Sequence, residues 1–203
     1  MKKFLLLPLA LAFASNAALA ANSVDLRVTG TITPAACDIT LTGGDVDFGS
    51  LKDLSSTEET SFTSPTKDLN ILCSAPTQVG IKAIDNRQGT NTGRAFGLGK
   101  DSADGKIGSY HIDLRNKTVD GSAGQLTRST DSGTTWTKVA DAMVNPAPTE
   151  IISWAATGTD APVPVTSVTQ QFEIDLAIAP TSTLDTSTDI TLDGSATIEL
   201  VYL

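Results

Sequence analysis

The chain has 203 residues and a formal net charge of −9, which becomes −11 without the two lysines at its start, Lys2 and Lys3. An acidic surface of this kind disfavours nucleic acid and anionic membranes, so we expect neither as a partner. The length suits one domain with a sizeable core, or at most one domain with a long insertion, and we do not expect two domains.

The first residues have the features of an export signal. Lys2 and Lys3 precede an apolar run over 4–13, and Ala18-Leu19-Ala20 places small residues at the cleavage positions. The apolar run is too short to span a bilayer comfortably. We therefore expect residues 1–20 to be a signal peptide. The mature chain, which has no second long apolar run, is expected in the periplasm or outside the cell, without membrane insertion.

The rest of the chain has the sequence character of an all-β sandwich. Ser, Thr, Gly and Asp surround short apolar alternations, and no helical stripe exceeds two turns. Asp131-Ser132-Gly133 predicts a hairpin turn, because Asp starts turns and Gly tolerates positive φ. Residues 86–106, rich in Gly, Asn and Asp, predict a long surface loop. The predicted strands are 23–32, 35–42, 45–49, 68–74, 78–85, 107–115, 124–129, 135–140, 150–155, 163–168, 170–179 and 189–203.

Both ends of the mature chain carry an apolar alternation of period two. In an extended segment alternate side chains share one face. That face is formed at the start by Val24, Leu26, Val28, Gly30 and Ile32, and at the end by Ala196, Ile198, Leu200 and Tyr202. We interpret the two segments as halves of a joint between subunits, one strand donated and another borrowed. The alternative is that 23–32 is the first strand of a closed sandwich.

The cysteine and histidine content excludes a Cys/His zinc site. The chain has two cysteines, Cys37 and Cys73, and one histidine, His111. Two cysteines in an exported chain most simply form one disulfide, which would stabilise the fold by roughly 4 kcal/mol. We expect no metal and no cofactor.

Several segments together carry a family resemblance. Residues 28–39 form an alternating extension with a glycine, a hydrophobic residue and then the first cysteine. Val46-Asp47-Phe48-Gly49 is a short hydrophobic strand ending in glycine, Leu69-Asn70-Ile71-Leu72-Cys73 carries the second cysteine, and Tyr202 is the penultimate residue. The combination resembles the chaperone–usher pilins, with a middle region similar to a poorly characterised fimbrial-like branch. Pilins usually carry a glycine further upstream of the terminus than Gly194.

The resemblance implies an immunoglobulin-like sandwich over 35–203 that lacks its final strand, preceded by a donor-strand extension over 21–34. It also implies that Cys37 and Cys73 join adjacent strands. A periplasmic chaperone would fill the open groove first, and a neighbouring subunit's extension would fill it after exchange at an outer-membrane usher. Gly30 would enter a shallow pocket of the groove. The residues expected to contact the chaperone are Ala196, Ile198, Leu200, Tyr202 and the carboxylate of Leu203.

The leading function is therefore a structural subunit of a surface fimbria, and we expect no enzyme. The second hypothesis is a stand-alone periplasmic or minor tip-proximal binding protein that uses loop 86–106. A secreted hydrolase ranks third, because the chain has no G-x-S-x-G motif and neither cysteine looks free to act as a nucleophile. His111 is expected on the solvent face of its strand, opposite Tyr110 and Ile112. A pair of carboxylates could still meet in space.

Overall fold

The computed structural model describes residues 26–32, 36–93 and 96–203. The expected signal peptide and Val24 lie outside the described residues. The chain divides into two units, 1–33 and 34–203. Within the described ranges, no helix is long and apolar enough to cross a membrane.

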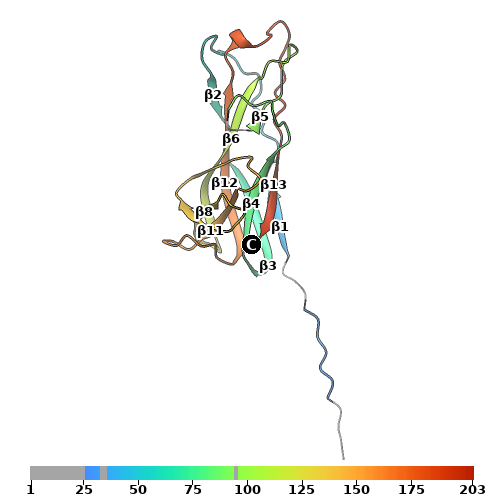
Figure 1. Ribbon diagram of the computed structural model, residues 1–203, viewed down its shortest axis with the longest axis vertical. Coiled ribbons are helices and arrows are strands. Elements are labelled where there is room, and N and C mark those ends of the chain that lie inside the picture. The colour runs from blue at the N-terminus through green and yellow to red at the C-terminus, as the bar shows by residue number, and fades with distance from the viewer. Residues whose placement is uncertain (1–25, 33–35, 94–95) are drawn as a thin grey trace, which may run out of the picture. The chain divides into compact units, whose positions relative to one another are not determined.

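The larger sheet is built on two long antiparallel strands, β6 (Gly108–Val119) and β12 (Val165–Ile178). Its order is β1-β3-β12-β6-β10, with β1 at Cys37–Leu41, β3 at Lys67–Thr77 and β10 at Ala142–Val144. Three short strands complete it: β2 (Thr60–Thr63) pairs with β12, whereas β5 (Phe96–Gly97) and β7 (Ser122–Ala123) pair with β6. Figure 1 shows β2 and β5 near one end of these long strands.

The smaller sheet has five antiparallel strands in the order β13-β4-β11-β8-β9. Their bounds are β4 Val79–Asp85, β8 Gln125–Ser129, β9 Thr137–Val139, β11 Ile151–Ala155 and β13 Ala196–Tyr202. A single 3-10 turn, η1 (Thr181–Thr183), lies between β12 and β13. The chain is thus nearly all β, as predicted.

The core lies between the two sheets, because each sheet turns one row of alternate apolar side chains inward. On β6, Tyr110, Ile112 and Leu114 are buried while His111 between them is half-buried on the other face, as expected. On the smaller sheet, Trp154 of β11 is completely buried. The packing of both rows into one cluster confirms the β-sandwich.

Two local predictions are also confirmed. Residues 131–133 lie in the hairpin loop between β8 and β9, and Ser132 and Gly133 have φ values of 61° and 90° there. Asp131 organises the turn by accepting hydrogen bonds from the backbone N–H groups of Thr134 and Thr135. Cys37 and Cys73 form the disulfide and face each other across β1 and β3.

Several predicted strands differ in the structure. No strand forms over 26–32 or over 45–49, and the strand predicted over 189–203 is paired only over 196–202. Alternation of apolar residues reports which face of an extended segment is buried. It does not report whether a neighbouring backbone lies within hydrogen-bonding distance, which a strand also requires. The two strands predicted over 163–168 and 170–179 are the single strand β12.

Some of the residues predicted as a surface loop over 86–106 belong to the core. Phe96 and Leu98 are buried, and β5 adds to the edge of β6. The buried carboxylate of Asp85 anchors the segment by accepting hydrogen bonds from the N–H groups of Arg87 and Gly97. The prediction was wrong for residues 96–99, because two apolar residues among glycines gave too weak a strand pattern. The short strands β2, β5, β7 and β10 were also not predicted.

A β-bulge in β6 carries a buried polar network. Between paired positions β12 advances from Gln170 to Phe172, while β6 moves from Lys117 to Leu114, so β6 contains an extra residue. The Gln170 side chain is completely buried, and its Nε2 donates to the carbonyl oxygens of Arg115, Asn116 and Gln171. Its Oε1 accepts a hydrogen bond from Trp154 Nε1. One amide thus satisfies the carbonyls that the bulge removes from the ladder.

We predict that Gln170→Leu lowers the free energy of unfolding by about 2–4 kcal/mol, because it leaves buried carbonyls and the Trp154 N–H without partners. Urea denaturation measures the change. Gln171→Leu is the matched control: its side chain is only half-buried and accepts one hydrogen bond, from Asn116. A loss for Gln170→Leu no larger than for the control would contradict the role of the amide.

Candidate functional site

A groove of about 1020 Å³ runs along the domain between the segment that follows β1 and the segment that leads into β13. Its floor is the inner face of the larger sheet. The floor residues are apolar and come from the two long strands: Tyr110, Ile112, Phe172, Ile174, Leu176 and Ile178. All of these floor residues except Ile174 are buried, so the groove ends on the packed core of the sandwich.

The first wall of the groove is residues 44–51. Val46 and Phe48 are half-buried, whereas Asp45 and Asp47 beside them are exposed, so the segment is extended with one apolar face. Among the described residues, no backbone-to-backbone hydrogen bond involves residues 45–50. The wall thus has the side-chain pattern of a strand and an open backbone edge.

The second wall is residues 189–198. Ile190 and Leu192 are half-buried and continue the alternation of β13. The N–H of Asp193 donates to the carbonyl of Leu98, and the carbonyl of Ser195 accepts from the N–H of Asn86, so the wall is fixed at these two residues. In the part of the domain that the structure describes, β13 pairs only with β4, so its other edge has no strand partner.

Gly194 lets the second wall approach the core. A Cβ added there would lie 3.0 Å from Cε1 of Tyr110 and 3.1 Å from Cδ2 of Leu98, both tighter than ordinary contacts. Tyr110 is itself fixed by stacking on Phe96, with ring centroids 5.1 Å apart. The glycine upstream of the chain end therefore has a packing role at the groove.

The N-terminal extension presents the complementary pattern. Leu26, Val28 and Ile32 are 86%, 86% and 97% exposed, and a Cβ added to Gly30 would meet nothing within 4 Å. Large apolar side chains are seldom this exposed without a partner. Of the five predicted donor residues, these four are described, and Val24 is not.

The C-terminal strand β13 continues from the second wall as the edge strand of the smaller sheet. Ala196, Ile198 and Leu200 are half-buried on the core side. The hydroxyl of Tyr202 accepts a hydrogen bond of 2.9 Å from the N–H of Cys37, and the N–H of Leu203 donates to the carbonyl of Gln78. The chain end is thus tied to β1 and to the start of β4, contacts that the sequence did not indicate.

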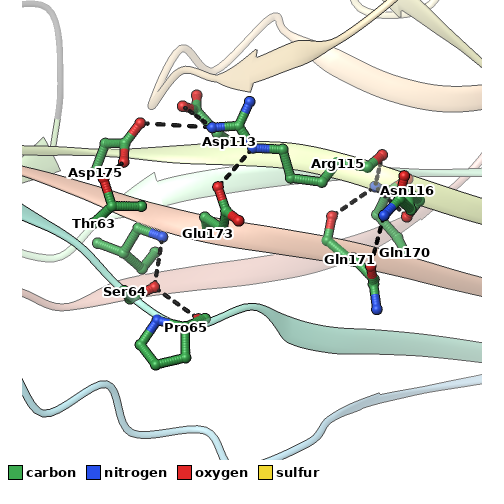
Figure 2. A network of polar contacts seen from close by, with 11 residues as sticks. Thr63, Ser64, Pro65, Asp113, Arg115, Asn116, Gln170, Gln171, Glu173 and Asp175 are labelled. Carbon is green, nitrogen blue, oxygen red and sulfur yellow. Dashed lines mark hydrogen bonds and ion pairs between the residues drawn. The ribbon is translucent and has the colours of Figure 1, made fainter.

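The second candidate site is a group of polar side chains on the outer face of the larger sheet (Figure 2). Nε of Arg115 donates to Oε2 of Glu173 at 2.8 Å, and its Nη2 lies 3.5 Å from Asp113 and 3.8 Å from Asp175. Thr63 of β2 donates to Asp175 at 2.7 Å. One guanidinium therefore holds three carboxyl groups from β6 and β12 together.

The carboxyl groups of this network differ in proton affinity. Burial, and then a hydrogen bond shared with Asp175, raise the pKa of Asp113. Hydrogen bonds from Asp113 and Thr63 lower the pKa of Asp175. The hydrogen bond to Glu173 raises the pKa of Arg115. The pKa values of the two neighbouring carboxyl groups are thus shifted in opposite directions. In the described part of the chain, no group of three His, Cys, Asp or Glu side chains could hold a metal ion.

Comparison with known proteins places the chain among bacterial relatives. Residues 26–95 match the family described as "Protein of unknown function (DUF1120)". "Protein GltF" of Escherichia coli (strain K12) is 30% identical over 240 aligned positions, which cover 96% of this chain and 94% of the relative. "Uncharacterized protein YhcF" of the same strain is 28% identical over 229 positions, which cover 95% of each chain. No solved structure is significantly similar.

We predict that Arg115→Gln lowers the free energy of unfolding by about 1 kcal/mol at pH 7. The loss is small because solvent screens a partly exposed ion pair. Without the guanidinium, the three neighbouring carboxyl groups repel one another when ionised, and protonation in acid relieves that repulsion in the folded state. The folded state then binds more protons than the unfolded state in acid, so the deficit shrinks toward pH 4. Urea denaturation at both pH values measures it.

Lys82→Gln is the control for this change, because it removes one exposed ion pair, to Glu199 at 2.8 Å, without leaving a group of acids behind. Its smaller loss should depend little on pH. An equal deficit for Arg115→Gln at pH 7 and pH 4 would show that repulsion among the carboxylates does not matter.

Proposed function

The chain belongs to the same family as Protein GltF of Escherichia coli, and we propose that it is a structural subunit of a surface fimbria assembled by donor-strand exchange. The observation that carries the proposal is the groove. Its two walls, 44–51 and 189–198, have apolar inner faces and open backbone edges, and its floor is apolar. An inserted strand would gain ladder hydrogen bonds and bury alternate side chains.

The occupant we propose is the extension of a second copy of the chain. Leu26, Val28, Gly30 and Ile32 alternate with Arg27, Thr29 and Thr31, so an extended backbone would turn all of the first set toward the floor. Burying three large apolar side chains that are almost fully exposed would contribute roughly 1.5–3 kcal/mol each. The family match over residues 26–95 includes both the described part of the extension and the first wall.

The proposal includes a route of assembly. The chain is exported, a periplasmic chaperone covers the groove and contacts the last strand and Leu203, and an outer-membrane usher exchanges the chaperone for the next subunit. The mature protein then lies on the cell surface and has no enzymatic activity. The absence of enzymatic activity is supported by the carboxyl groups of Asp113 and Asp175. Arg115 and Thr63 already bind them, and they lie on a sheet face outside the groove.

A stand-alone periplasmic binding protein or a minor tip-proximal subunit is the alternative if the groove takes no strand. The hypothesis of a binding protein rested on a surface loop predicted over 86–106. That argument is weakened, because residues 96–99 are buried in the domain. The following two experiments distinguish the alternatives.

We predict that the mature chain without residues 21–32 aggregates or folds slowly, since its apolar groove has no strand to fill it. A synthetic peptide of residues 22–32, at about 100 times its Kd, should raise the melting temperature by roughly 5–10 °C through mass action. The same peptide with Val28→Asp should have little effect, because it places a charge in an apolar site. A shortened chain that is monomeric, stable and indifferent to the peptide supports the stand-alone protein.

We also predict that Gly30→Leu leaves the fold of the monomer and its binding to the chaperone unchanged but blocks exchange between subunits. The added side chain has free space in the monomer. In a donated strand it would prevent close approach to the recipient sheet. Circular dichroism reports the fold of the monomer, and size-exclusion chromatography reports chaperone binding and exchange between subunits. Polymerisation at the wild-type rate, or unfolding of the isolated monomer, contradicts the donor-strand role of 23–32.

A further inference from the structure

The rim of the groove has charge of one sign. Three charged residues line it, Asp45 and Asp47 on the first wall and Asp189 on the second, and no lysine, arginine or histidine does so in the described chain. All three are exposed. None of them forms an ion pair with another described residue. The groove therefore combines an apolar floor with an acidic rim.

The position of these acids follows from the alternation of the first wall. Val46 and Phe48 point toward the core, so Asp45 and Asp47 point away from it and share one face. Across the groove Asp189 is also exposed, next to the half-buried Ile190. A strand lying in the groove would have its outward side chains close to this rim.

The extension carries one charge in its described part. Arg27 is the sole charged residue of 26–32, and it lies between Leu26 and Val28. When these two apolar side chains point to the floor, Arg27 points outward, toward the level of the rim. The arginine has a long side chain with five N–H donors, which suits contact with carboxylates on either wall.

We propose that Arg27 of a donated extension pairs with the acidic rim formed by Asp45, Asp47 and Asp189, and that this charge complementarity selects a second copy of this chain. The inference rests on the proposed donor-strand function and names its specificity. The apolar residues supply most of the affinity, as in other strand additions. The charge contact favours the correct segment and speeds its capture, and salt weakens it.

The test uses the monomeric fraction of the exported full chain and fluorescent peptides of residues 22–32, with binding followed by fluorescence anisotropy. Binding is measured at about 20 mM salt, where charges are screened only over a long distance, and at about 500 mM salt, where the screening length is short. At low salt the Arg27→Gln peptide should bind about two- to five-fold more weakly than the wild-type peptide. Asp25→Asn, which removes the negative charge of the peptide, should bind more tightly. Both differences should nearly vanish at high salt.

The recipient side provides the matched control. Full chain with Asp45, Asp47 and Asp189 changed to asparagine should bind wild-type and Arg27→Gln peptides equally. Asp38→Asn, an exposed acid of β1 outside the groove, should preserve the difference. Equal binding of all peptides to wild-type protein overturns the charge selection alone. Absence of binding by the wild-type peptide overturns the donor-strand function and this inference together.

Discussion

Backbone hydrogen bonding is the constraint on which the rest of this structure depends. Every peptide group in a sheet needs a partner, and the larger and smaller sheets end at β1 and β13 without closing on each other. Extended segments continue from both strands along the groove, where their apolar side chains pack on the core but one backbone edge stays open. The groove is the place where the side-chain requirements of a sandwich are met and its backbone requirements are not.

The fold class could be predicted because alternation is a local property of the sequence. Tyr110, Ile112 and Leu114 show the buried face of β6 without any knowledge of its neighbours. The short strands could not be predicted in this way. β5 has two residues, and Phe96 is buried because β6 lies next to it. The bulge in β6 was hidden as well, since it is defined by the register with β12 and by the amide of Gln170.

The candidate site, too, could be predicted only where its residues follow a local pattern. The alternating residues at both chain ends were evident in the sequence, including Leu26, Val28 and Ile32, whose exposure the structure records. The walls were only partly predictable: the pattern of Val46 and Phe48 predicted a strand, and the structure has an extended segment that pairs with no strand. The acidic rim brings together residues more than 140 positions apart, Asp47 and Asp189, so no local pattern could identify it. The Arg115 network has the same origin, since β6 and β12 meet only in the folded sheet.

On the proposed fimbrial function, the contacts around Cys37 would have a mechanical consequence. Tension passing along linked subunits would enter each domain from the extension, immediately before β1. At that point the disulfide joins Cys37 to β3, and the Tyr202 hydroxyl joins the same residue to β13. The load would therefore be divided between both sheets at its point of entry. Peeling β1 from its sheet would require a covalent bond to break, and shear across many hydrogen bonds at once would be the remaining way to fail.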